Sequence, residues 1–105
     1  MSNTSVDPNV ELYADWEGES IGMAYGAITF AVRPCSASLP HSHRSEELWL
    51  VQSGSGWAAI DGHRTDLKAG ARLAVPAGSE HHIVNPEGAP LVVLSFWWRG
   101  RAGES

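Results

Sequence analysis

Two histidines and two adjacent glutamates lie close together between residues 40 and 54 of the chain. His41 and His43 are separated by one residue, and because the side chains of an extended strand alternate between its two faces, both imidazoles point to the same side. Glu47 follows four residues after His43 and opens an apolar run typical of a strand. A third imidazole, His81, follows a turn further along. Three imidazoles and one carboxylate form a donor set suited to a divalent transition metal.

Both segments resemble the two signature motifs of the cupin superfamily. The first motif is HxH, three or four residues, Glu, six residues and Gly, and it is met here by His41, His43, Glu47 and Gly54. The second is Gly, five residues, Pro-x-Gly, two residues, His, three residues and Asn, and it is met by Gly70, Pro76, Gly78, His81 and Asn85. One position departs from the family, since Cys35 stands where cupins usually place a glycine six residues before the first histidine.

The resemblance implies that four side chains hold one divalent metal ion per chain. These implied ligands are His41, His43, Glu47 and His81. Fe2+, Zn2+, Mn2+ and Ni2+ all accept imidazole and carboxylate donors, and the spacing does not choose among them. In some cupins the matching glutamate turns away from the metal and acts as a base, so Glu47 is both a candidate ligand and a candidate catalytic residue. A cupin that kept the fold but lost its metal is the inert alternative.

Strand patterns fill most of the chain, and no helical apolar period is present. Residues 10–16 alternate between apolar and polar, residues 21–33 form a longer extended segment, and residues 91–99 are apolar on both faces. Asp61-Gly62 is a strong signal for a two-residue hairpin turn. These patterns predict an all-β antiparallel barrel or sandwich. The resemblance narrows this to the cupin-type double-stranded antiparallel β-helix, a jelly-roll barrel.

A length of 105 residues predicts a single domain. We expect a disordered N-terminal arm at residues 1–9, one cupin domain at residues 10–100 and a frayed tail at residues 101–105. The formal net charge of -5 comes without a basic stripe, which argues against a nucleic-acid partner. No stretch approaches the roughly 20 apolar residues that span a bilayer. The single cysteine is consistent with a reducing compartment, so we expect a cytoplasmic protein with no membrane partner.

The metal site should open into a pocket with apolar and aromatic walls. If Glu47 points into the barrel, strand alternation places Trp49 on the same inward face. The last strand contributes one of its two faces, which carry either Phe96 and Trp98 or Trp97. Arg33 could bind a substrate carboxylate, or it could cap a strand end in solvent. The predicted pocket residues are therefore Arg33, Trp49, Phe96 and Trp98.

A homodimer is the expected assembly. Both faces of residues 91–99 are apolar, and the N-terminal strand has no evident partner in so small a barrel. An apolar face and an unpaired strand edge are both covered readily by a second copy of the chain.

Three functions agree with these features. The first is a metal-dependent enzyme acting on a small organic substrate, as a dioxygenase or as an isomerase, lyase or cyclase. The second is a module that binds a small sugar or acid without turnover. The third is an accessory metal-binding domain that works beside a larger biosynthetic enzyme.

Overall fold

The computed structural model describes residues 7–100, which form nine strands and no helix. The strands are β1 (Val10–Ser20), β2 (Met23–Val32), β3 (Ser36–Ala37), β4 (Glu46–Ser53), β5 (Ser55–Ile60), β6 (His63–Lys68), β7 (Arg72–Val75), β8 (His81–Asn85) and β9 (Leu91–Gly100). The all-β prediction is confirmed. A helix long and apolar enough to cross a membrane is accordingly not found in this part of the chain.

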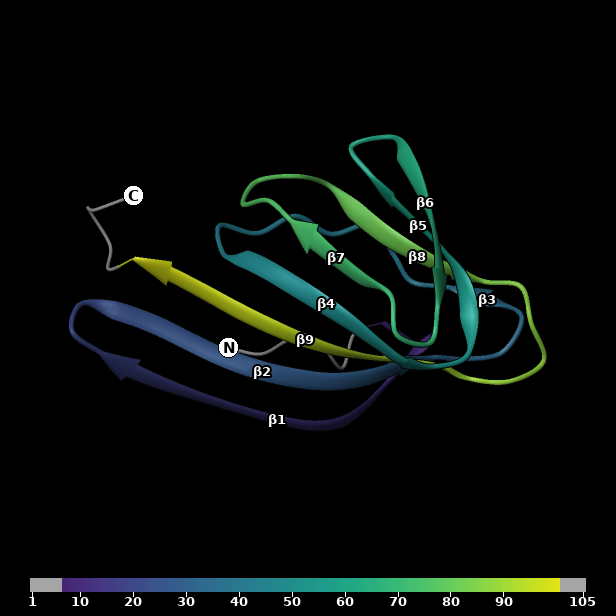
Figure 1. Cartoon of the computed structure of the whole chain (residues 1–105), viewed down its shortest axis with the longest axis horizontal. Helices are drawn as coiled ribbons and strands as arrows, with labels where there is room; N and C mark the ends of the chain where they lie inside the picture. Colours follow the sequence, from purple (N-terminus) through teal and green to yellow (C-terminus); the bar gives the residue numbers. More distant parts are fainter. Residues whose placement is uncertain (1–6, 101–105) are drawn as a thin grey trace.

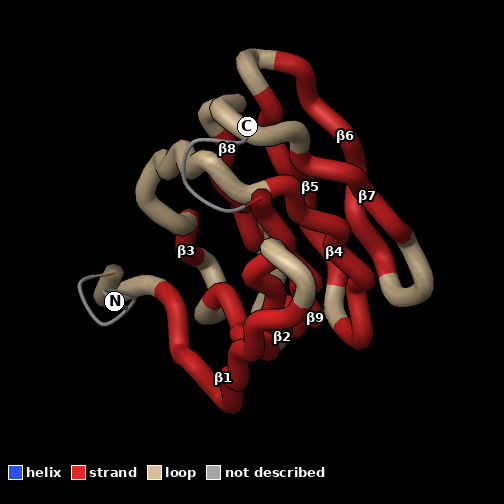
Figure 2. Tube along the Cα trace, turned by 90° about the vertical axis from the view of Figure 1, so that its left-hand side faces the viewer, coloured by secondary structure: helices blue, strands red, loops and turns tan. Residues whose placement is uncertain are grey.

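Two antiparallel sheets face each other across the core (Figures 1 and 2). One sheet has the strand order β1-β2-β9-β4-β7, and the other has the order β3-β8-β5-β6. Figure 1 shows the long strands β1, β2 and β9 running past the shorter strands of both sheets. This double-sheet arrangement is the predicted jelly-roll barrel.

Side chains from both sheets fill the interior, and strand alternation decides which ones. Leu91 and Val93 of β9 and Trp49 and Val51 of β4 are all at most 3% exposed. From the opposite sheet, Ala58, Leu67 and Ile83 pack against them. Because Glu47 lies two residues before Trp49, it shares the inward face of β4.

A bulge in β1 changes which of its side chains face inward. Val10 and Leu12 turn toward the interior, but the register shifts between Leu12 and Ala14. The extra residue reverses the alternation, so Trp16 lies on the outer face and is 58% exposed. The alternation of residues 10–16 predicts that Val10, Leu12, Ala14 and Trp16 share one face, but the bulge moves Ala14 and Trp16 to the other face. β1 is the expected edge strand, and it pairs with β2 along its length.

Part of the predicted N-terminal arm lies within the described structure. Residues 1–6 and 101–105 lie outside the described part of the structure, so the arm and tail predicted there stay predictions. Residues 7–9, however, form a turn, and Asp7 is only 4% exposed. Its two carboxylate oxygens accept hydrogen bonds from the backbone N–H of Asn9 at 3.0 Å and of Leu39 at 2.9 Å. The bond from Leu39 connects Asp7 to the loop that precedes His41.

Buried Asn85 ties the end of β8 to the end of β2. The residue is fully buried, and its Nδ2 donates to the carbonyl oxygens of Val32, Arg33 and Ala89 at 2.9 to 3.2 Å. Its Oδ1 accepts from the backbone N–H of Glu87 at 3.0 Å. A short amide that fills all these positions at once explains why the second motif ends on asparagine.

Cys35 adopts a backbone conformation that favours glycine. Its φ of 55° lies in the left-handed region, which costs a residue with a Cβ about 1 kcal/mol or more. Two glycines of the second motif, Gly70 and Gly78, adopt the same region with φ of 90° and 82°. The departure from the motif therefore leaves the turn in place and adds strain to it.

Replacing Cys35 tests that strain. We expect Cys35→Gly to be more stable than Cys35→Ala by about 1 kcal/mol, since glycine releases the strain and alanine retains it. Both variants lose the contact of Sγ with the Glu87 carbonyl at 3.6 Å. The difference between their free energies of unfolding therefore reports the backbone strain alone. Urea unfolding of the two variants measures it. Equal stability would show that the turn carries no strain.

Candidate metal centre

Three side chains from separate segments converge at one wall of the interior. His43 lies in the loop before β4, Glu47 on β4 and His81 at the start of β8. One ligand atom from each of the three lies within 4.8 Å of the other two. Imidazole and carboxylate donors at this spacing fit a divalent transition metal. The sequence motifs predicted this grouping for these three residues.

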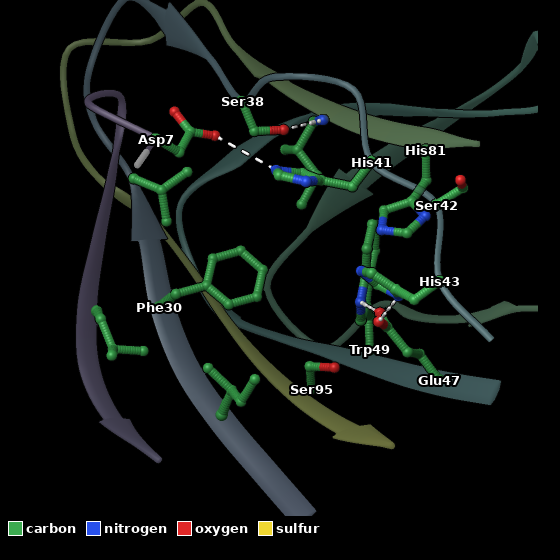
Figure 3. Close-up of a pocket in the computed structure, with 14 residues that line it drawn as sticks. Asp7, Phe30, Ser38, His41, Ser42, His43, Glu47, Trp49, His81 and Ser95 are labelled. Carbon is green, nitrogen blue, oxygen red and sulfur yellow. Dashed lines mark hydrogen bonds and ion pairs between the residues drawn. The ribbon is translucent and has the colours of Figure 1, made fainter. Parts of the chain in front are cut away.

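Glu47 is held in place by two hydrogen bonds. Its Oε2 lies 2.9 Å from Nδ1 of His43, and its Oε1 accepts a hydrogen bond from Nε1 of Trp49 at 2.8 Å. Figure 3 shows the carboxylate between these two partners. Burial alone would raise the pKa of Glu47, but the hydrogen bond and charge of His43 outweigh it, and the net pKa is lowered. Glu47 is therefore an ionised carboxylate, as ligation requires.

His81 is fixed as a neutral imidazole. It is 6% exposed, and its Nδ1 lies 3.3 Å from the carbonyl oxygen of Ser79. A carbonyl only accepts, so Nδ1 carries the hydrogen and Nε2 keeps its lone pair for a ligand. Burial lowers the pKa of His81, whereas the hydrogen bond to Glu47 raises the pKa of His43. A metal bound here needs a lone pair on one ring nitrogen of His43, so it would displace one of the two protons that the raised pKa favours on that ring.

His41 lies in the same cavity but outside this group of three. It pairs with His81 through two backbone hydrogen bonds of 2.9 and 2.8 Å, which places both side chains on the same face. Its imidazole is turned toward Asp7, with Nε2 at 3.7 Å from Oδ2 of that carboxylate. The ring centroid is 6.3 Å from those of His43 and His81. His41 would join the other three only after its side chain rotates.

The site opens into a cavity of about 410 Å³ with largely apolar walls. Residues from both sheets line it (Figure 3), and they include Leu12, Ile28, Phe30, Trp49 and Ile83. The sequence predicted Trp49 here but missed Ile28 and Phe30. The sequence does contain a signal for both residues, because strand alternation places them on the same face as Val32, which is buried. A volume of this size accommodates a small organic molecule.

The structure corrects the other three predicted pocket residues. Ser95 of β9 faces the cavity, so alternation turns Phe96 and Trp98 to the outer face, where they are 42% and 37% exposed. Both faces of β9 are apolar, so the sequence left open whether Phe96 and Trp98 or Trp97 would face the cavity. Arg33 also lies outside the cavity, because its Nε donates to the Pro8 carbonyl at 3.2 Å and its guanidinium pairs with Glu11 at 3.5 Å.

Asp7, which lines the cavity beside His41, is not among the pocket residues predicted from the sequence. Residues 1–9 are polar and were assigned to the arm as a whole. The triplet Asp7-Pro8-Asn9 carries a turn signal, because aspartate accepts hydrogen bonds from the backbone that follows it. That signal would have marked residues 7–9 as a turn rather than as part of a disordered arm.

Comparison with known proteins gives one family and several relatives. Residues 28–97 match the family described as Cupin domain. The chain is 33% identical over 64 residues to mannose-1-phosphate guanylyltransferase from Klebsiella pneumoniae, a match over 61% of this chain and 13% of that protein. It is 42% identical over 50 residues to dimethylsulfoniopropionate lyase DddW from Ruegeria pomeroyi, a match over 47% of this chain and 33% of that protein. The chain thus spans only a minor part of both relatives.

A solved structure agrees with this family match. A Cupin 2 conserved barrel domain protein from Salinispora arenicola superposes with a TM-score of 0.65 and is 26% identical, covering 86% of this chain and 74% of that one. The match of the family to residues 28–97, together with the two-sheet barrel, shows that the chain belongs to the cupin family.

Proposed function

We propose that the protein is a metal-dependent enzyme that acts on a small organic substrate inside the barrel. His43, Glu47 and His81, joined by His41, would hold one divalent ion such as Fe2+, Zn2+, Mn2+ or Ni2+. The observation that carries the proposal is the convergence of three donor groups within 4.8 Å at the wall of a cavity of about 410 Å³. A bound ion of this kind supplies Lewis acidity or redox chemistry.

The residues of the chain prepare the site for proton transfer. Glu47 is ionised and held by Trp49 and His43, so it can accept a proton from a substrate beside it. The Glu47 side chain is only 11% exposed, which limits the access of water to that carboxylate. We therefore assign Glu47 the role of catalytic base as well as that of ligand.

The name of one relative supports a reaction on a small acid. Dimethylsulfoniopropionate lyase DddW shares 42% identity over 50 residues with this chain. The test is to incubate metal-loaded protein with small organic acids, with and without oxygen, and to follow the loss of each acid. Loss that requires oxygen would indicate a dioxygenase, and loss without oxygen an isomerase, lyase or cyclase. No loss of any acid with any of the four metals would contradict an enzymatic role.

A second candidate is an accessory metal-binding domain. It is favoured by the match to mannose-1-phosphate guanylyltransferase, which involves only 13% of that larger protein. A non-catalytic module that binds a sugar or acid would share the same cavity. Both alternatives predict ligand binding without turnover by the isolated chain, so the incubation described above separates them from the enzyme.

We also propose that a second copy of the chain covers the outer face of the five-stranded sheet. Trp16, Ala27, Phe96 and Leu48 form one cross-strand row on this face. Trp16, Phe96 and Leu48 are 38 to 58% exposed, and an exposed apolar row of this kind is typical of an interface.

Light scattering at micromolar concentration tests the proposed homodimer. We expect wild type to have twice the mass of the chain and Phe96→Glu to have the mass of a monomer, because the charge would be buried in the interface. Leu39→Glu is the matched control, since Leu39 is 44% exposed and Phe96 42%, and Leu39 lies outside this sheet. A monomeric wild type would contradict the proposal.

A further inference from the structure

Ser95 is a buried polar residue in the middle of an apolar wall. It lies on β9 between Ile28 of β2 and Trp49 of β4, its direct neighbours in the register of the sheet. The residue is 3% exposed and lines the cavity (Figure 3). The other buried side chains on this face of β9, Leu91 and Val93, are aliphatic. An aliphatic side chain would be the expected choice at this position too.

Among the described residues, none forms a hydrogen bond with the hydroxyl of Ser95. Buried serines elsewhere are engaged, since Oγ of Ser79 donates to the Pro76 carbonyl at 2.6 Å and Oγ of Ser45 accepts from Arg99 at 3.3 Å. Within residues 7–100, no side-chain oxygen or nitrogen is both sealed from solvent and unpaired. Oγ of Ser95 therefore opens into the cavity, where a bound molecule can reach it.

The charged residues around the cavity limit which charged groups a bound molecule can carry. Among the described residues that line it, Asp7 and Glu47 are acidic, and there is no lysine or arginine. Arg99 is engaged elsewhere, stacked on Trp97 at 5.2 Å and bonded to Ser45. A second anionic group, away from the metal ligands, would find no cation to pair with and would be desolvated at a large cost.

We propose that Ser95 hydrogen-bonds the substrate, and that the site takes a short molecule with one anionic group at the metal, one neutral polar group at Ser95 and an otherwise apolar body. A second carboxylate or phosphate group away from the metal is disfavoured, because no lysine or arginine of the described lining could pair with it. The inference rests on the proposed metal site, because the anionic group is assigned to the ion. It adds a specificity-determining residue and a substrate class to that site.

The experiment compares short acids that differ in one group. Zn2+-loaded and metal-free protein are titrated by calorimetry with butanoate, 3-hydroxybutanoate, 4-hydroxybutanoate and butanedioate. We expect one of the hydroxylated acids to bind the Zn2+-loaded protein about three- to tenfold more tightly than butanoate, the range of one neutral hydrogen bond. Butanedioate should bind more weakly than butanoate. Ser95→Ala should bind the hydroxylated acid no more tightly than butanoate, whereas Ser53→Ala, on the exposed end of β4, should behave as wild type.

The outcomes separate the inference from the function on which it rests. If butanoate binds only with Zn2+, but wild type prefers butanedioate or makes no distinction among the acids, the role of Ser95 is overturned and the metal site stands. A preference for the hydroxylated acid that survives in Ser95→Ala overturns it as well. If none of the acids binds the Zn2+-loaded protein more tightly than the metal-free protein, the metal site fails and the inference fails with it.

Discussion

Glu47→Gln should lower the rate of turnover by about 100-fold or more while most of the bound metal is retained. The amide has the shape of the carboxylate, and its oxygen can still accept the hydrogen bond that Trp49 now donates to Glu47 at 2.8 Å. It cannot accept a proton, however, so the base is lost. The imidazoles of His41, His43 and His81 remain to hold the ion. Substrate consumption and elemental analysis of the same samples measure both effects.

Glu46→Gln is the matched control for this variant. Glu46 is the adjacent carboxylate, but it pairs with Trp98 on the outer face of the sheet and is exposed to solvent. The control should keep wild-type turnover. Equal turnover in wild type and Glu47→Gln would show that Glu47 is not the base. A loss of metal as large as the loss of turnover would show that it acts only as a ligand.

His43→Ala and His81→Ala should each weaken metal binding by more than about 100-fold. The loss of a residue that only hydrogen-bonds a metal ligand costs about 10- to 100-fold, and the loss of a ligand itself should cost more. Each imidazole supplies a donor atom within the group of three, and alanine supplies none. His41→Ala should weaken binding as well if its side chain rotates from Asp7 toward the ion. Competition with a chromophoric chelator measures these affinities.

Two other histidines provide controls for these variants. His63 is exposed on β6. His82 faces away from the cavity, and its ring centroid lies 6.0 Å from that of Trp57. His63→Ala and His82→Ala should bind metal as wild type does. If His43→Ala and His81→Ala also bind metal as wild type does, the ion is held elsewhere.

The sequence predicted the parts of this protein that depend on short-range rules. The spacing of His43, Glu47 and His81 matched a known motif, and strand alternation then placed Glu47 and Trp49 on one face. Asp61-Gly62 forms the predicted hairpin turn between β5 and β6, with φ of 49° and 85°. In each case the local pattern and the family motif agree with the final structure.

Features set by the packing of distant segments were not predictable in the same way. The bulge after Leu12 reverses the strand period, and nothing in the alternating sequence marks it. β9 is apolar on both faces, so only the sheet beneath it decides that Ser95 points inward and Phe96 outward. The turn of His41 toward Asp7 joins residues 34 positions apart in a contact that depends on the tertiary fold.

One divalent ion is expected to bind at His43, Glu47 and His81. Anomalous diffraction from crystals of the metal-loaded protein, collected at the absorption edge of the metal, tests it most directly. The expected result is one strong peak per chain at about 2.0 to 2.2 Å from an imidazole nitrogen of His43, an imidazole nitrogen of His81 and a carboxylate oxygen of Glu47. A peak at another place in the protein, or none at full metal loading, would contradict the claim.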